Sequence, residues 1–392
     1  MYPRLATQHL QHLVSQLPAI LTLDAQQVGK TTLARSAFPT LPYCDLEDPA
    51  TQILFTEDPR FQLDARAQPA LILDEAQRIP SLFAALRGAI DADRQKFGRF
   101  IILGSAQPML VQQVAESLAG RVGVLELGPL SFQEITSSAT PSPDWKSLWL
   151  TGGFPDAFAA SGRGGSFRDW WEAYLRAYLE RDLPMLGLSA EPLLMRRLLT
   201  MLAHAQGGLA NFSQLAASLG IAQRTVTRYI DILEQTFLLR RLPPYFRNIG
   251  KRLVKAPKIY LRDTGLLHHL LNIDSLTGLE NHPIRGASWE GFVIEDVLRR
   301  ERIRHPHSQA YFWRTTAGAE IDLLIDRGDQ LHAIEVKTAR ATSPHLARLL
   351  RSALTDVGAM GVCVIDQGTG ADPLASAIDR KGFEMASAWL PE

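Results

Sequence analysis

The sequence predicts an α/β fold built from more than one domain, and three observations lead to this prediction. An apolar run at residues 19–23 is followed by a Gly-Lys-Thr loop and a helix-like segment. A second apolar run, at 70–73, ends in two carboxylates. Two strand-like segments near the C-terminus, 319–326 and 331–337, carry acidic residues and are separated by a short turn. Because buried-type strands alternate with amphipathic segments at the N-terminal end, a parallel sheet flanked by helices is expected there.

The Gly-Lys-Thr loop has the strand, loop and helix context of a phosphate-binding loop. In such loops backbone N–H groups surround the phosphates at a helix N-terminus, the lysine reaches the β- and γ-phosphate oxygens, and the next hydroxyl binds Mg²⁺. Asp24 departs from the pattern G-x-x-x-x-G-K-[ST], because it occupies the position of the first glycine. Its negative charge is expected to weaken triphosphate binding. The residues expected to bind ATP are Gln27, Val28, Gly29, Lys30, Thr31 and Thr32.

Polar residues follow the next strands in positions that would complete this site. Asp74 is expected to hold Mg²⁺ together with Thr31, and Glu75 to polarise the attacking water. Ser105, after a third strand-like run, is a candidate for sensing the γ-phosphate or orienting that water. Arg121 is a candidate arginine finger, within the chain or across a subunit boundary, with a surface arginine as the alternative. A chance Gly-Lys-Thr is the alternative for the loop alone, and carboxylates at this spacing argue against it.

Eight tracts, spread over nearly the whole chain, share their residues with one family. They are QVGKTTL at 27–33, LDEAQRIP at 73–80, LGS at 103–105, AGR at 119–121, GPLSF at 128–132, YLERDL at 178–183, LPPYFRNIGKR at 242–252 and ASWEGF at 287–292. Together they resemble the prokaryotic AAA-type ATPases that carry a C-terminal domain of unknown function. The resemblance implies a P-loop AAA-type nucleotide-binding domain. The sequence departs from the family at Asp24-Ala25-Gln26, where the family has Gly-Pro-Arg.

Composition is that of a multidomain globular protein. The chain has 392 residues, 46% hydrophobic and 21% charged, and its 41 basic residues balance 41 acidic ones. Zero net charge excludes a basic field over the whole chain, so any nucleic-acid contact must come from local patches. Cys44 and Cys363 lack metal-type spacing, which favours buried thiols in a reducing compartment. No apolar run of about 18 residues is present, so we expect a cytoplasmic protein without a membrane segment.

Breaks in the pattern divide the chain into four segments. We expect the AAA-type P-loop ATPase core at 1–130, a helical lid or linker at 131–190, a winged helix-turn-helix at 191–245 and a restriction-endonuclease-like domain at 246–392.

The third segment contains a helix-turn-helix pattern, in which a first helix with its Gly-containing turn at 212–221 is followed by a second helix at 222–233. Ser213 is expected to cap the first helix. An apolar wing at 237–242 follows, and a basic run comes after it. The residues expected to contact nucleic acid are Arg224, Arg228, Lys251, Arg252 and Lys255. A protein-binding adaptor and a solvated hairpin are the alternatives.

The C-terminal segment contains a set of acidic residues with a Glu-x-Lys motif. Glu335 and Lys337 are two positions apart and therefore share one face of a strand, and a hairpin brings Asp322 beside them. Glu290 on the preceding helix completes the set. Carboxylates around Mg²⁺, with a lysine to orient water, are typical of metal-assisted phosphodiester cleavage, so we expect Glu290, Asp322 and Glu335 to bind metal.

The order of a helix and three strands also resembles the restriction-endonuclease-like superfamily. A structural acid and lysine pair joining two strands, or a fold kept as a nucleic-acid clamp, are the alternatives to an active nuclease.

The sequence as a whole predicts an ATP-binding and ATP-hydrolysing protein that uses Mg²⁺ and acts on DNA in repair, recombination or defence. Self-association into a homo-oligomer stays open. One alternative is a nucleotide-dependent sensor or regulator that binds protein partners. Another is a DNA-binding scaffold that does not hydrolyse ATP because of Asp24.

Overall fold

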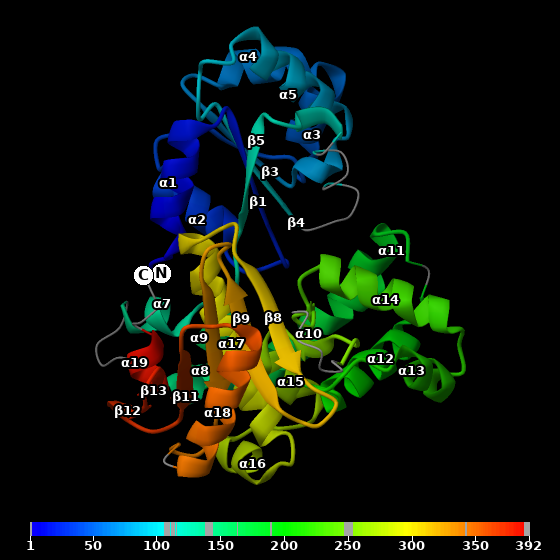
Figure 1. Ribbon diagram of the computed structural model, residues 1–392. Helices are drawn as coiled ribbons and strands as arrows, with labels where there is room; N and C mark the ends of the chain where they lie inside the picture. Colours follow the sequence, from blue (N-terminus) through cyan, green and yellow to red (C-terminus); the bar gives the residue numbers. More distant parts are fainter. Residues whose placement is uncertain are drawn as a thin grey trace. The chain divides into compact units, whose positions relative to one another are not determined.

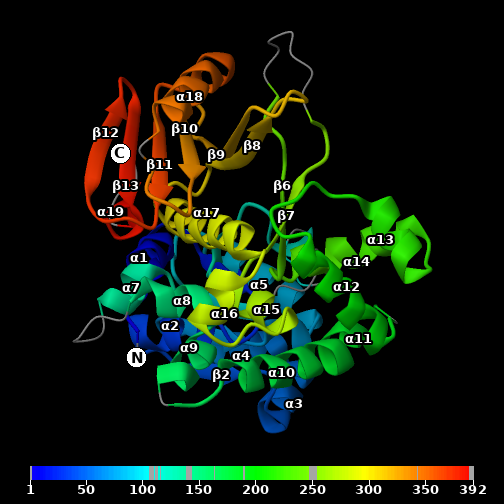
Figure 2. The ribbon, with the colours of Figure 1, turned by 90° about the horizontal axis from the view of Figure 1, so that it is seen from below.

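The computed structural model forms two compact units. It describes residues 2–105, 110, 114, 116–137, 144–162, 164–188, 190–246, 254–341 and 343–387. Unit 1 comprises Met1–Leu130, Met185–Gly187 and Gln235–Phe237, and unit 2 comprises Ser131–Pro184, Leu188–Glu234 and Leu238–Glu392. Among the described residues, unit 1 contains one sheet and unit 2 contains two, and we describe the two units separately (Figures 1 and 2).

Unit 1 is built on a five-stranded parallel sheet in the order β2-β3-β4-β1-β5. The strands are β1 Ala19–Asp24, β2 Tyr43–Asp45, β3 Leu71–Asp74, β4 Phe100–Ser105 and β5 Val122–Glu126. The helices are α1 Ala6–Gln16, α2 Lys30–Ala37, α3 Pro49–Glu57, α4 Pro59–Arg66, the 3₁₀ turn η1 Ala76–Arg78 and α5 Ser81–Ala92. The predicted α/β fold with a parallel N-terminal sheet is therefore confirmed.

Burial on both faces explains why these strands are continuous apolar runs. Every residue of β1, β3 and β4 is buried. On β3, Leu73 belongs to the core that contains Leu86 of α5, whereas Ile72 packs with Ala34 of α2 on the other face. Because successive side chains of a strand point to opposite faces, helices on both sides require apolar residues at every position. The polar residues that end these strands thus collect at one edge of the sheet.

The N-terminal half of unit 2 is helical. Its helices are α7 Phe132–Thr136, α8 Trp145–Thr151, α9 Pro155–Gly162, α10 Phe167–Ala177, the π-helical turn η2 Tyr178–Asp182, α11 Leu183–Met185, α12 Pro192–His204, α13 Phe212–Leu219 and α14 Gln223–Gln235. Asn211, not Ser213, caps α13, because its side chain accepts the N–H of Gln214. Gly220 ends α13 in a left-handed conformation, φ 69°, that glycine adopts without strain.

A two-stranded hairpin follows α14. Strand β6 Leu239–Leu242 pairs antiparallel with β7 Lys258–Leu261. The boundary expected at 245 falls in the connection between these two strands, so β6 lies before it and β7 after it. The connection also joins the next sheet, since Tyr245 and Val254 donate backbone hydrogen bonds to Phe312 and Arg314.

The C-terminal half of unit 2 is a six-stranded mixed sheet in the order β12-β13-β11-β10-β9-β8, which Figure 2 shows strand by strand. Its elements are α15 Thr264–Leu270, α16 Leu276–Asn281, α17 Arg285–Arg304, β8 Gln309–Arg314, β9 Glu320–Asp326, β10 Leu331–Val336, α18 Pro344–Val357, β11 Val362–Asp366, β12 Ala371–Ala375, β13 Ile378–Gly382 and α19 Phe383–Ser387.

The order of these elements along the chain is a helix, three antiparallel strands, a second helix and a strand parallel to the third. Strands β8, β9 and β10 form the antiparallel part, and β11 returns parallel to β10 after α18. Helix α18 covers one face of the sheet through Leu350 and Leu354, which pack with Ala333 and Val364. Within the described ranges, no helix is both long and apolar enough to cross a membrane.

Candidate functional site

The loop between β1 and α2 has the backbone shape of an anion site. Gln27 and Gly29 both have positive φ, 64° and 96°, and Gly29 forms the N-cap of α2. Left-handed residues in such a loop turn successive N–H groups toward one concave surface, which lies here at the positive end of a helix dipole. The structure therefore brings the predicted residues 27–32 together at a helix N-terminus.

Lys30 bonds to the loop itself. Its buried Nζ donates to the carbonyl oxygen of Ala25 at 2.8 Å and lies 3.4 Å from that of Asp24. Burial lowers the pKa of Lys30, while the charges of Asp24, Glu75 and Asp74 act in the opposite direction. The ammonium must exchange these carbonyl contacts for phosphate oxygens when a nucleotide enters the loop.

Asp24 stands where the pattern has a glycine, and the backbone accommodates it. The residue is 1% exposed, and its Oδ1 accepts the N–H of Ala25 at 2.5 Å. A loop N–H is thus engaged by a side chain, and a carboxylate lies close to the position of the phosphates. Both effects oppose anion binding.

Asp74 receives hydrogen bonds from two hydroxyls. Its Oδ2 accepts Thr31 Oγ1 at 2.6 Å and Tyr43 Oη at 2.9 Å. P-loop proteins hold Mg²⁺ with a hydroxyl in the first turn of the helix and a carboxylate at the end of a neighbouring strand. The residues present therefore fit Mg²⁺ at this position, next to the loop.

Glu75 follows Asp74 in a strained conformation. Its φ of 53° places it in the left-handed region, which a residue with a Cβ rarely adopts and which recurs at functional sites. Gln77 Nε2 donates to its Oε2 at 2.5 Å. Burial and the neighbouring charge of Asp74 raise the pKa of Glu75. A carboxylate of raised basicity at this position is suited to polarise water.

Ser105 and Arg4 border the loop from other segments. Ser105 pairs in register with Asp24 at the ends of β4 and β1, and its buried Oγ has no hydrogen-bond partner among the described residues. Arg4 donates from Nη1 to Val28 O at 2.8 Å and from Nη2 to Gly128 O at 2.5 Å. Arg4 thus ties the loop to the segment after β5.

Arg121 lies at the opposite end of the sheet. The next residue, Val122, pairs with Ala19, the first residue of β1, so Arg121 lies at the end of the sheet where β1 begins. The loop begins five residues further along this strand, which is roughly 17 Å at about 3.3 Å per residue. Arg121 instead pairs with both carboxylate oxygens of Asp91, at 2.8 and 2.9 Å. Arg121 thus lies away from its own loop, and its role as an arginine finger, within the chain or across a subunit boundary, stays a prediction.

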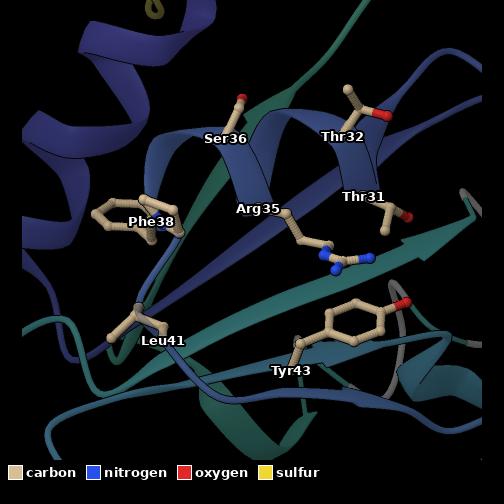
Figure 3. Close-up of a pocket in the computed structure, with 8 residues that line it drawn as sticks. Thr31, Thr32, Arg35, Ser36, Phe38, Leu41 and Tyr43 are labelled. Carbon is tan, nitrogen blue, oxygen red and sulfur yellow. The ribbon is translucent and has the colours of Figure 1, made fainter.

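A cavity of about 460 Å³ lies beside α2 (Figure 3). Its lining residues are Thr31, Thr32, Arg35, Ser36, Phe38, Pro39, Leu41 and Tyr43. The guanidinium carbon of Arg35 lies 5.0 Å from the centre of the Tyr43 ring, and Figure 3 shows the two side chains facing each other. Because Thr31 and Tyr43 also bond to Asp74, this cavity adjoins the expected Mg²⁺ position.

The expected C-terminal carboxylates converge, but with a lysine among them. Lys258 Nζ lies 2.8 Å from Glu290 Oε1, 2.5 Å from Glu320 Oε1 and 3.5 Å from Asp322 Oδ1. Burial lowers the pKa of Lys258, but the carboxylates outweigh burial, so the net shift is upward. Burial and the charge of Asp322 raise the pKa of Glu290.

The Glu-x-Lys pair lies in the same cluster. Lys337 Nζ bonds to Glu335 Oε1. Burial, followed by the charge of Asp322, raises the pKa of Glu335. Among the residues that the structure describes, no group of three or more His, Cys, Asp or Glu is arranged to hold a metal ion. The expectation that Glu290, Asp322 and Glu335 bind a metal ion stays a prediction, and the structure places the Lys258 ammonium within 3.5 Å of Glu290 and Asp322.

The residues expected to contact nucleic acid are exposed where they are described. Arg224 and Arg228 lie one turn apart on the exposed side of α14, away from the buried Val226 and Ile230. Lys255 is exposed in the connection before β7. Lys251 and Arg252 lie outside the described residues.

Five residues at these sites escaped sequence reasoning, namely Arg4, Tyr43, Gln77, Lys258 and Glu320. Gln77 and Glu320 had a local signal, since each lies two residues from a predicted carboxylate, Glu75 and Asp322. The other three come from distant segments, and their polar atoms reach the sites through pairing and packing that no spacing along the chain reveals.

A parallel sheet in the order 2-3-4-1-5, with a Gly-Lys-Thr loop after strand β1, which lies between β4 and β5, defines unit 1 as a P-loop domain of the AAA type. Family models agree. An AAA domain matches residues 18–136, and two domains of unknown function match 142–277 (DUF8612) and 285–379 (DUF4143).

Two mycobacterial proteins match almost the whole chain. The uncharacterized protein Rv2008c of Mycobacterium tuberculosis is 41% identical over 377 residues, which cover 95% of this chain and 82% of that protein. The uncharacterized protein Mb2031c of Mycobacterium bovis matches with the same values. The chain therefore belongs to the family of these proteins.

Solved structures of ATPases are similar to the chain at low identity. The Walker-type ATPase PABY2304 of Pyrococcus abyssi is 15% identical, with a TM-score of 0.48, and the match covers 68% of this chain and 94% of that one. The RuvB Holliday junction branch migration motor of Thermotoga maritima is 20% identical, with a TM-score of 0.30, and the match covers 61% and 86%.

Proposed function

We propose that unit 1 binds ATP with Mg²⁺ and hydrolyses it to ADP and phosphate. The observation that carries this proposal is the hydrogen bond of 2.6 Å between Thr31 and Asp74, at the N-terminus of α2 and next to Glu75. Fold alone does not imply activity. Phosphoryl transfer requires groups that hold Mg²⁺ and a group that positions the nucleophile, and beside this loop these are the Thr31 hydroxyl, the Asp74 carboxylate and the Glu75 carboxylate.

Each residue has a distinct part in this reaction. The N–H groups of residues 27–32 and the ammonium of Lys30 bind the phosphates. Thr31 and Asp74 hold Mg²⁺, which supplies neutralisation of the developing charge on the phosphate oxygens. Glu75 accepts a hydrogen bond from the attacking water and directs the water oxygen at the γ-phosphorus, and Gln77 fixes the position of that carboxylate.

Replacing Asp24 with Gly is expected to tighten Mg-ATP binding about tenfold. The change removes a negative charge beside the phosphates and frees the N–H of Ala25, which together correspond to about 1.4 kcal/mol. Isothermal titration calorimetry measures both dissociation constants. Lys30→Ala is the control and should not bind. If neither the wild type nor Asp24→Gly binds nucleotide, the proposed function is wrong.

We propose as a second function that unit 2 contacts DNA, with α12 to α14 and the β6–β7 hairpin acting as a winged helix. Arg224 and Arg228 on α14 support this proposal, because a second helix with exposed basic residues is the element that enters a major groove. The chain order of α17, β8, β9, β10, α18 and β11 favours a restriction-endonuclease-like fold that serves as a clamp. A protein partner on α14 is the competing interpretation.

Replacing both Arg224 and Arg228 with Ala is expected to weaken DNA binding for all sequences. Each lost phosphate contact lowers the slope of log K against log salt by about 0.9, so the slope should fall by about 2. Fluorescence anisotropy with labelled duplex DNA at several salt concentrations measures it. Arg348→Ala/Arg351→Ala, two exposed arginines of α18, is the matched control. An equal slope in the Arg224/Arg228 variant and the wild type would favour a protein partner.

A further inference from the structure

Lys258 is surrounded by three carboxylates in the interior of unit 2. Its side chain is 3% exposed, and Nζ lies within 3.5 Å of Glu290, Glu320 and Asp322. An ammonium has three N–H donors, and each of them has a carboxylate oxygen within reach. The lysine therefore acts as the counter-ion of a cluster whose charges would otherwise repel one another.

The local backbone fixes this arrangement from both sides. On β7, Lys258 and Tyr260 are two positions apart and share a face, so both donate to Glu290 Oε1, at 2.8 and 2.5 Å. Strands β8 and β9 pair at Tyr311 with Leu324 and at Trp313 with Ile321. Between these two pairs β9 has one residue more than β8, and this extra residue forms a β-bulge. A bulge re-aims the side chain that it contains, which here is Asp322. Its Oδ2 accepts the N–H of Val336 at 2.9 Å, so its Oδ1 stays toward Lys258.

The ammonium occupies the position that a divalent cation needs. Mg²⁺ requires oxygen ligands at about 2.0 to 2.1 Å in octahedral geometry. Nζ already lies between Glu290 and Asp322, so a cation that bound both carboxylates would have to displace it. Glu335 lies close enough to interact electrostatically with Asp322 and Glu290. It is only 6% exposed, and its Oε2 has no hydrogen-bond partner among the described residues.

We propose that Lys258 is the resident cation of this cluster, and that replacing its ammonium with a neutral side chain creates a site for Mg²⁺ or Mn²⁺. The ligands of that latent site are carboxylate oxygens of Glu290, Asp322 and Glu335. The wild-type protein holds the β6–β7 hairpin against the sheet through this lysine, and its carboxylates take no metal while the lysine is in place. This inference is independent of the nucleotide site.

Electron paramagnetic resonance of Mn²⁺ tests the proposal on the full-length protein without nucleotide. Wild type is expected to show no bound Mn²⁺ that depends on Glu335, and Lys258→Met is expected to bind one equivalent. The double variant Lys258→Met/Glu335→Gln should lose that equivalent. If wild-type protein binds Mn²⁺ and Asp322→Asn removes the binding, or if folded Lys258→Met binds none, the proposal is overturned.

Two further variants keep the test informative if Lys258→Met folds poorly. Lys258→Gln removes the charge and keeps a donor for Glu290, so it should bind Mn²⁺ as Lys258→Met does. Lys258→Arg keeps the charge and should bind none. Since a ligand that binds only the folded state stabilises it, Mn²⁺ should raise the melting temperature of Lys258→Gln and leave that of Lys258→Arg unchanged. Equal shifts in both variants would contradict the proposal.

Discussion

Replacing Glu75 with Gln is expected to reduce ATP turnover at least 100-fold while Mg-ATP stays bound. The amide is nearly isosteric with the carboxylate and keeps the packing, but it is a much weaker acceptor for the proton of the attacking water. Correct placement of a general base contributes on the order of 10² to 10⁴ in rate. Phosphate release measured with a coupled assay gives kcat, and calorimetry on the same sample gives the dissociation constant.

The pH dependence of turnover provides a second measurement of Glu75. Only the ionised carboxylate accepts a proton, so activity is lost as pH falls through its pKa. Since burial raises that pKa, the acidic limb of the profile should lie above pH 4.5, the ordinary value for glutamate. Glu57→Gln, at the exposed end of α3, should leave rate and profile unchanged. Equal turnover in wild type and Glu75→Gln would remove Glu75 from the mechanism.

The parts of the nucleotide site that could be predicted are those that follow one another along the chain. A buried strand, a loop with Gly29 and a helix are contiguous, so local residue types determine their geometry. Asp74 was predictable because it ends an apolar strand, and parallel strands end at the same edge of a sheet. Arg4 and Tyr43 reach the site from segments whose placement depends on the whole sheet.

Arg121 and Lys258 show what a motif alone does not determine. A Gly-Arg pair after a helix is typical of an arginine finger. Strand β5, however, starts at the end of the sheet opposite the phosphate-binding loop, so Arg121 lies away from that loop. The Glu-x-Lys hairpin brings Glu335 to Asp322 as predicted, because strand alternation is a local property. Lys258 enters this cluster from a hairpin more than 60 residues earlier, through the pairing of Tyr245 and Val254 with β8.

Replacing Glu295 with Ala is expected to destabilise unit 2 by about 3 to 5 kcal/mol. Glu295 of α17 is 2% exposed and receives hydrogen bonds from Arg240 of β6 and from Arg262, the residue after β7. Burial acts to raise its pKa, but the two arginines outweigh burial and lower the pKa to about 2. Truncation leaves two buried guanidinium groups without their shared carboxylate, which costs far more than losing a surface pair.

Tryptophan fluorescence in a urea titration measures this loss in unit 2 alone, since all seven tryptophans lie between residues 145 and 389. Glu234→Ala is the matched control, because Glu234 pairs with Arg241 near the surface and should contribute less than about 1 kcal/mol. A lowered carboxyl pKa stabilises the folded state above the unfolded value of 4.5 and loses this contribution as pH falls toward 2. The difference between wild type and Glu295→Ala should therefore shrink between pH 4.5 and 2. A constant difference would mean that packing, not the buried charge, accounts for the effect.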